Sequence, residues 1–217
     1  MVKPAKLLTL TLAAFSIIAM TLGYAPISTV DAQQSEKVKA MSDNEFWSTI
    51  AQTKSGADER GRQLKALQAT LSKLSPDQIL GFEAAFSRQM SRSYSWELWS
   101  AAYVIHGGCS DDGFDYFRRW LISRGRETFE RALADPDTLA SVIPKTADEA
   151  LDFEEFGYVA AEVWQKRTGK SLNEFYAAAE NTVSPAEPSG QEFVEDEAYL
   201  TKRYPNLWKR FGHNPLI

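Results

Sequence analysis

The sequence predicts a single all-α domain, on the basis of three observations. Apolar residues recur at steps of three and four along most of the chain, which is the period of a helix with one buried face. Capping residues precede these stretches, and glycine or proline follows them. Alternating strand patterns, hairpin signals and internal repeats do not occur. We therefore expect one orthogonal or irregular bundle of about eight or nine helices with a docked C-terminal segment.

Composition excludes several classes of protein. The chain has 217 residues, with 24 Lys and Arg, 29 Asp and Glu, and 44% apolar residues, which is ordinary for a folded soluble domain and excludes wholesale disorder, a collagen-like repeat and a protein that crosses a membrane several times. The net charge of -5 argues against a nucleic-acid partner, since such partners usually require a basic face. One cysteine excludes an internal disulfide, and two histidines exclude a His-rich zinc site.

Residues 1–32 have the three parts of a secretory signal peptide. Lys3 and Lys6 precede an uncharged apolar run over 7–22, and a small-x-small sequence ends at Ala32. We expect cleavage near Ala32 and export to the periplasm or the medium. An uncleaved N-terminal membrane anchor is the alternative, although the run is shorter than the ~20 residues that a spanning helix needs. The mature chain is expected to have no stable membrane span.

The rest of the chain divides by composition. We expect a linker over 33–41, the all-α domain over 42–180, a second linker over 181–192 and a docked aromatic tail over 193–217. The second linker contains Ser-Pro-Ala-Glu-Pro-Ser-Gly, which has turn-forming residues and no apolar anchor. The tail regains aromatic residues, which we expect to pack against the domain: Phe193, Tyr199, Tyr204, Trp208 and Phe211.

The first three helices of the domain have clear local signals. Capping boxes at 42–45 and 75–78 begin the first and the third helix, and Pro76 takes the first helical position of the third. The second helix carries one stripe of leucines at helical spacing: Leu64, Leu67, Leu71 and Leu74.

Aromatic residues mark the fourth helix, over 96–105. Trp96, Trp99 and Tyr103 recur at helical spacing. We expect them in the core, because aromatic rings dominate the energetics of helix packing. A groove for carbohydrate or peptide is the alternative. The helix should end at Gly107 or the glycine that follows it.

Four further helices are expected before the second linker. Ser110 caps one that ends at Gly125, and the next covers 126–134. A long helix is expected over 147–167, and a short one over 171–179. Aromatic and small residues share one face of the long helix: Phe153, Phe156, Ala160 and Trp164.

The most distinctive segment is 96–125, where an apolar-aromatic helix, a Gly-Gly-Cys-Ser turn and a second aromatic helix follow one another. It resembles the bacterial domain-of-unknown-function family 4240, and the resemblance extends from 46–47, through Leu-Ser-Pro at 74–76, to about Phe175. It implies an uncharacterised domain with no activity, ligand or catalytic residue to carry over. The typical member looks cytoplasmic, so the signal peptide is a departure that puts in doubt any role depending on cytosolic partners.

The Gly-Gly-Cys-Ser-Asp-Asp-Gly segment is the best location for a site. Each of its residues has a structural role. The glycines end one helix, and Ser110 caps the next. Asp111 and Asp112 place negative charges at the positive end of the dipole of that second helix. These roles account for the whole segment and are the simpler interpretation. Exposed carboxylates beside a glycine-rich turn can also hold a hard cation through oxygen. The candidate metal ligands are Asp111, Asp112 and Asp115.

The helix after this turn carries a mixed polar stripe. Asp111, Asp115 and Arg118 lie at spacings of four and three, and such stripes more often form ion pairs within the helix than a site. A hydrolase or metal-dependent enzyme would instead use carboxylates as acid and base. Its candidate catalytic residues are Asp111, Asp112, Asp115, Arg118, Glu154 and Glu155.

These patterns favour a binding protein over an enzyme. The sequence has no nucleophile–base motif, no glycine-rich phosphate loop and no convincing metal-ligand spacing, and no cofactor is predicted. We expect an exported binding or interaction domain whose aromatic and acidic surfaces contact a protein or a cell-envelope polymer. The alternative is the carboxylate enzyme near the Gly-Gly-Cys-Ser-Asp-Asp turn. Cys109 is expected to be buried and inert, or bonded to another chain.

Overall fold

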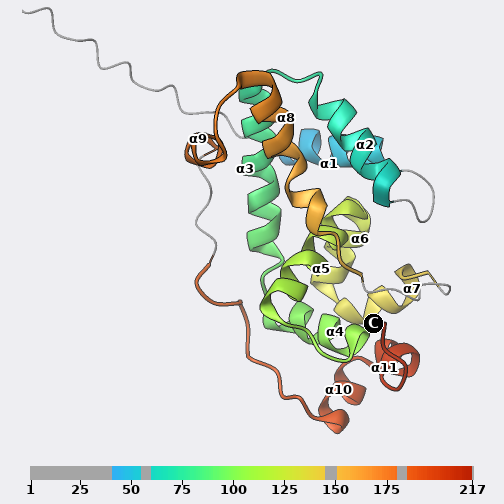
Figure 1. The fold of residues 1–217 in the computed structure, drawn as a ribbon. Helices are drawn as coiled ribbons and strands as arrows, with labels where there is room; N and C mark the ends of the chain where they lie inside the picture. The colour runs from blue at the N-terminus through green and yellow to red at the C-terminus, as the bar shows by residue number, and fades with distance from the viewer. Residues whose placement is uncertain (1–40, 55–59, 145–150, 180–184, 217) are drawn as a thin grey trace, which may run out of the picture. The chain divides into compact units, whose positions relative to one another are not determined.

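The computed structural model describes residues 41–54, 60–144, 151–179 and 185–216. All of them belong to one compact unit, Lys37–Ile217. The predicted signal peptide and the first linker up to residue 40 lie outside the described residues. Within the described ranges the chain forms eleven α-helices, two 3₁₀ turns and no strand, which confirms the all-α class and slightly exceeds the expected number of helices (Figure 1). No helix in this part of the chain is long and apolar enough to span a membrane.

The first six helices follow the predicted order. They are α1 (Asp43–Thr53), α2 (Arg60–Leu71), α3 (Pro76–Arg92), α4 (Trp96–His106), α5 (Asp111–Ser123) and α6 (Arg126–Ala134). Serine side chains cap four of these helices by accepting a backbone N–H of the first turn, and two of the caps are complete capping boxes. The capping serines are Ser42, Ser75, Ser95 and Ser110.

The prediction of a single long helix over 147–167 is wrong. Residues 145–150 lie outside the described residues, 151–153 are not helical, η2 (Glu154–Gly157) is a 3₁₀ turn, and only α8 (Val159–Thr168) is an α-helix. The backbone of this segment bonds to α5 instead: the N–H of Phe153 donates to the carbonyl of Tyr116 at 3.2 Å. Tertiary contacts therefore override an apolar spacing that fits a helix.

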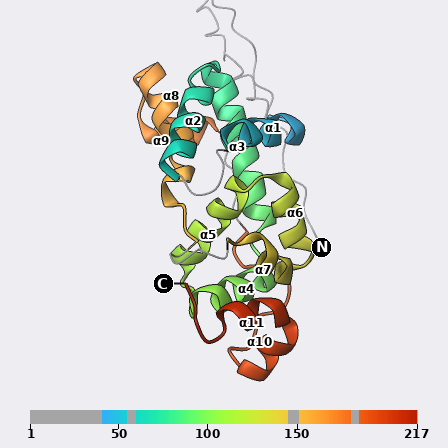
Figure 2. The same cartoon turned by 90° about the vertical axis from the view of Figure 1, so that its right-hand side faces the viewer.

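Short elements complete the chain. After α6 come η1 (Pro136–Thr138) and α7 (Leu139–Val142). After α8 comes α9 (Leu172–Ala178), which Ser171 caps and which matches the short helix expected over 171–179. The tail forms α10 (Glu197–Arg203) and α11 (Pro205–Phe211). Figure 2 shows α11 beside α4 and α7, which it contacts. The docking predicted for the C-terminal segment is confirmed, because five of its side chains are buried: Leu200, Tyr204, Leu207, Phe211 and Leu216. The expectation that Tyr199 packs against the domain is wrong, since its side chain is 41% exposed.

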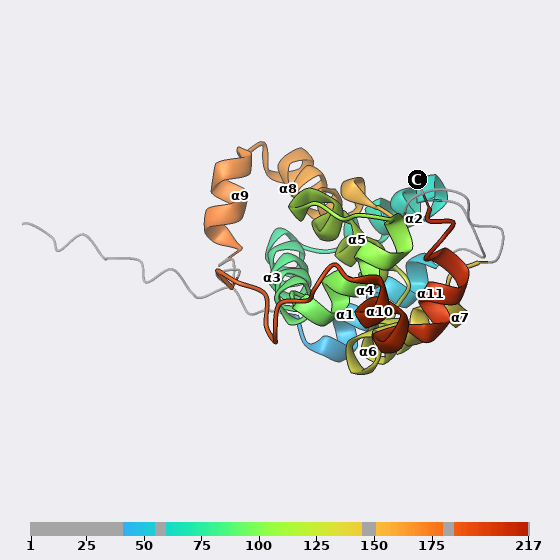
Figure 3. The same ribbon diagram turned by 90° about the horizontal axis from the view of Figure 1, so that it is seen from below.

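Aromatic side chains fill much of the core. Burial of each contributes roughly 1.5–3 kcal/mol from removal of apolar surface from water. Around this core α3 packs against α8, and α1 and α2 pack together. α9 lies against α8, and Figure 3 shows these two helices next to each other from below. Six phenylalanines are fully buried: Phe46, Phe114, Phe117, Phe129, Phe153 and Phe175.

The aromatic residues of α4 are less buried than expected. Trp96, Trp99 and Tyr103 are half-buried, so their assignment to the core is only partly correct. The tail covers part of them: the ring of Phe193 lies 6.2 Å from that of Trp96 and 5.6 Å from that of Tyr103. The backbone of Ser189 also bonds to the segment before α4, in an isolated parallel bridge with Ser95. The chain after the second linker therefore lies along this aromatic face.

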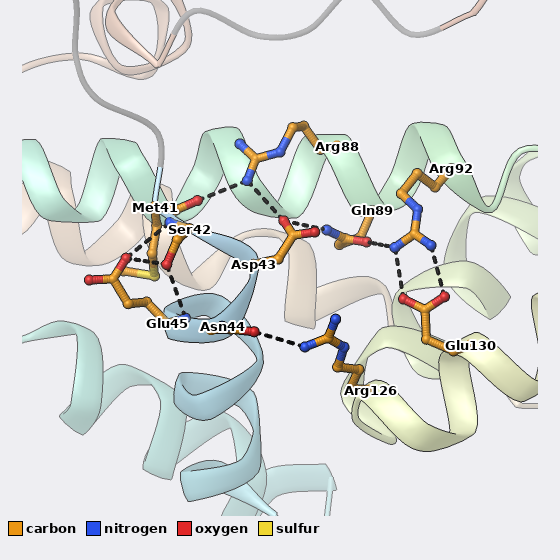
Figure 4. Close-up of polar contacts among 10 residues, drawn as sticks. All are labelled: Met41, Ser42, Asp43, Asn44, Glu45, Arg88, Gln89, Arg92, Arg126 and Glu130. Carbon is orange, nitrogen blue, oxygen red and sulfur yellow. Dashed lines mark hydrogen bonds and ion pairs between the residues drawn. The ribbon is translucent and has the colours of Figure 1, made fainter.

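A polar network fixes α3 between α1 and α6 (Figure 4). Asp43 at the start of α1 accepts hydrogen bonds from Arg88 at 3.1 Å and from Gln89 at 3.3 Å. Gln89 in turn accepts from Arg92 at 2.7 Å, and Arg92 forms an ion pair with Glu130 of α6 at 2.8 Å. These contacts set the position of α3, which forms one wall of a cavity.

Candidate functional site

The turn between α4 and α5 has the predicted structural roles. Gly107 has a φ of 65° and ends α4 in the left-handed conformation that favours glycine. A Cβ at Gly107 would lie 2.8 Å from Cγ of Pro215, so the tail also requires glycine there. Ser110 caps α5, because its hydroxyl oxygen accepts the N–H of Gly113 at 3.2 Å.

Replacement of Ser110 by alanine is expected to lower the free energy of unfolding by about 0.5–2 kcal/mol, because the first turn of α5 loses its side-chain acceptor. Urea denaturation measures this difference. Ser110→Thr is the matched control, since it keeps a hydroxyl and should retain most of the stability. Equal denaturation midpoints for the wild-type protein and Ser110→Ala would contradict the cap.

A cavity of about 270 Å³ lies beside this turn and contains four of the six candidate catalytic residues. Glu154 and Glu155 are not among its lining residues: they lie on η2, where Glu154 accepts a hydrogen bond from the hydroxyl of Tyr158 at 2.9 Å. We call it the α5 cavity. Its walls are Tyr94 and Trp99, the acidic residues Asp111, Asp112 and Asp115, and Arg118 and Pro185.

The charges of the α5 cavity are only partly compensated. Asp115 forms the ion pairs expected within the helix, with Arg118 at 2.9 Å and with Arg119 at 2.6 Å. Burial is the largest effect on Arg118 and lowers its pKa. Asp111 and Asp112 are exposed, and no described residue forms an ion pair or a side-chain hydrogen bond with either of them. The cavity therefore carries two carboxylates without a partner in the described ranges.

The aromatic wall of the α5 cavity is rigidly placed. The indole N–H of Trp99 donates to the carbonyl of Cys109 at 3.0 Å. The Trp99 ring stacks on Phe114 at 4.8 Å and on Trp96 at 5.2 Å between centroids. The guanidinium of Arg118 lies 4.8 Å from the ring centroid of Tyr94, so the charged and aromatic parts of the wall are in contact.

Cysteine chemistry has no support at this turn. Cys109 is half-buried rather than buried, and burial raises the pKa of its thiol to about 12, with a smaller contribution from Asp111. The thiol is therefore protonated at neutral pH and is a poor nucleophile. His106 accepts the N–H of Leu151 at 3.1 Å on Nε2, and burial lowers its pKa to about 4. The imidazole is occupied by this structural hydrogen bond.

Metal binding was the other hypothesis for Asp111, Asp112 and Asp115. All three line the α5 cavity. Among the described residues there is no group of three or more His, Cys, Asp or Glu side chains arranged to hold a metal ion.

A second cavity, of about 170 Å³, contains a residue that the sequence analysis missed. We call it the Glu83 cavity. Glu83 is 6% exposed, and no described residue forms an ion pair or hydrogen bond with its carboxyl group. Burial raises the pKa of Glu83 to about 7, and the charge of Arg119 opposes this effect. The sequence does contain a signal for it, because Glu83 is the one charged residue in the otherwise apolar run over 79–86. In the structure all the residues of this run are buried.

The all-α fold, with its capped helices, its aromatic core and the α5 and Glu83 cavities, defines a small helical domain. The chain belongs to the family described as "Protein of unknown function (DUF4240)", whose model matches residues 41–166. The match covers α1 to α7, η2 and most of α8, and ends before the limit near Phe175 that the resemblance suggested. No curated protein and no solved structure matched the chain.

Proposed function

We propose that this chain is an exported, non-enzymatic binding domain, and that the α5 cavity binds a positively charged group of a protein or cell-envelope polymer. The observation that supports this proposal most directly is the combination of Asp111 and Asp112 with the ring of Trp99 in one cavity. Carboxylates attract a cation, and an aromatic face adds its quadrupole to that attraction.

The charge of the α5 cavity favours a cation over an anion. Three aspartates and one arginine line it, and the arginine is paired with Asp115. This leaves the charges of Asp111 and Asp112 to act on a ligand. Because both carboxylates are exposed, salt should screen the attraction, and binding should weaken as the ionic strength rises.

Export rests on the N-terminal sequence. Lys3 and Lys6, the apolar run over 7–22 and the small residues before Gln33 support cleavage and transport. Mass spectrometry of the protein recovered from its own cell envelope would test this directly. A mature N-terminus at Gln33 is the expected result, and a full-length chain in the cytosol would contradict export.

The double substitution Asp111→Asn and Asp112→Asn is expected to weaken binding of a tetralysine peptide about tenfold, since each exposed charge contributes roughly 0.2–1 kcal/mol. Quenching of tryptophan fluorescence during titration would report the affinity. Asp77→Asn is the matched control, because Asp77 is also an exposed acidic residue in the first turn of a helix. Equal weakening by the control, or equal binding of the acetylated peptide, would contradict the proposal.

A further inference from the structure

The Glu83 cavity lies between helices that are distant in sequence. α3 contributes Glu83, Phe86, Ser87 and Met90, and α5 contributes Asp115 and Arg119. The remaining wall comes from η2, from the residue that precedes α8 and from α9: Gly157, Tyr158 and Tyr176. Ionisable groups of α3 and α5 thus face the same space as the apolar and aromatic side chains.

Arg119 is held in a fixed position at this wall. Its Nη2 pairs with Asp115 at 2.6 Å, and its Nη1 donates to the carbonyl oxygen of Glu154 at 2.7 Å. Its guanidinium lies 5.0 Å from the ring centroid of Tyr158. A Cβ at Gly157 would lie only 2.7 Å from Nη1 of Arg119, so the chain leaves room there for the guanidinium.

The charges around the cavity favour an anion when Glu83 is protonated. Arg119 and Asp115 line the Glu83 cavity, and Asp115 also pairs with Arg118, which lines the α5 cavity instead. One carboxylate therefore pairs with two guanidinium groups. The three groups therefore have one net positive charge. A protonated Glu83 adds no charge and supplies a hydroxyl that can donate to an oxygen of a ligand. An ionised Glu83 would instead repel an anion.

We propose that the Glu83 cavity is a second binding site, which holds a small monocarboxylate between the carboxylic acid of Glu83 and the guanidinium of Arg119. The volume equals roughly that of five or six water molecules, which suits a short acid. Phe86 and Met90 would contact its apolar part. Besides the cavity itself, the state of Glu83 also points to a ligand. Its carboxyl group is buried and has no hydrogen-bond partner in the described ranges, which lowers the stability of the fold unless a ligand in the cavity forms hydrogen bonds with it.

Binding of an anion beside Glu83 should be coupled to its proton. The carboxylate ligand binds the protonated form, so affinity should fall about tenfold per pH unit once Glu83 ionises. The charged and titratable groups that face Glu83 are Asp115 and Arg119 from α5, and Tyr158 and Tyr176 from the η2–α8 junction and α9. On α3 itself, the charge of Arg88 is paired with Asp43 of α1. Burial raises the pKa of Tyr176, which keeps it protonated across the range tested.

Ligand-observed NMR titration of the full chain with butyrate, butyramide and butylamine, from pH 6 to pH 9, tests the proposal. Butyrate should bind best, and its affinity should fall about tenfold between pH 8 and pH 9. Glu83→Gln should bind butyrate without this pH dependence, because the amide is neutral and still donates a hydrogen bond. Preferential binding of butylamine, or one pH profile shared by the wild-type protein and Glu83→Gln, would overturn the proposal.

Variants at the two cavities separate the two proposals. Arg119→Gln should abolish butyrate binding, and Glu83→Gln gives the answer independently if that variant fails to fold. The Asp111→Asn and Asp112→Asn double variant should leave butyrate binding within about twofold of wild type, since neither residue lines the Glu83 cavity. Loss of butyrate binding in that double variant would contradict a separate site.

Discussion

Replacement of Glu83 by glutamine is expected to raise the free energy of unfolding by about 3 kcal/mol at pH 8. The reason is that burial raises the pKa of Glu83 from 4.5 to about 7 in the folded chain. An unfolded chain exposes the same carboxyl group to water and ionises it more easily. Glutamine has nearly the same shape and carries no charge, so it avoids this cost.

The sign of the pH dependence distinguishes this effect from simple repacking. At pH 4 the carboxyl group is protonated in both states, and the Glu83→Gln difference should be close to zero. Between pH 4.5 and 7 the unfolded state loses its proton first, so this group lowers the stability of the wild-type protein as the pH rises. Above pH 7 the full cost is present and the difference between wild type and variant should be constant.

Urea denaturation of both proteins from pH 4 to pH 8 measures this difference. Glu155→Gln is the matched control, because Glu155 is exposed and its removal should have an effect within about 0.5 kcal/mol at every pH. A difference for Glu83→Gln that is the same at pH 4 and pH 8 would show that burial of the charge is not its cause.

The start of each early helix could be predicted because the signals are local. Ser42, Ser75 and Ser110 lie next to the backbone N–H groups that they cap, so spacing along the sequence is enough to identify them. The segment over 147–167 could not be predicted in this way. Its Glu154 carbonyl accepts a hydrogen bond from Arg119, which is distant in sequence, and local periodicity contains no information about that partner.

Residues of the α5 cavity could be predicted from the sequence and Glu83 could not, again because only local signals can be recognised in a sequence. Asp111 and Asp112 were identified because they follow a glycine-rich turn, and the structure places both in one cavity with Arg118. Glu83 was missed because a one-sided apolar pattern predicts one buried face, whereas most of the first half of α3 is buried. The helices that surround α3 are set by the whole fold. The local sequence therefore does not indicate that Glu83 is buried in the structure.

Asp137→Ala is expected to lower the free energy of unfolding by about 3 kcal/mol, because it removes a buried acceptor that holds the tail. Asp137 is 6% exposed. Its carboxylate accepts the backbone N–H of Asn206 at 3.0 Å and of Leu207 at 2.8 Å, and the side-chain amide of Asn206 at 2.6 Å. These are the first N–H groups of α11, which is too short to be stable without tertiary contacts.

The loss of stability in Asp137→Ala should be largest in the tail as well as measurable for the whole domain. Trypsin should cleave after Lys202 and Arg203 faster in Asp137→Ala, because release of α11 exposes the preceding helix, and mass spectrometry of the fragments would identify these sites. Asp77→Ala, which removes an exposed aspartate from another helix start, should cleave at the wild-type rate. Equal tryptic rates in both variants would show that the tail docks without Asp137. Pro185 lines the α5 cavity, so weaker tetralysine binding in Asp137→Ala would link docking of the tail to that cavity.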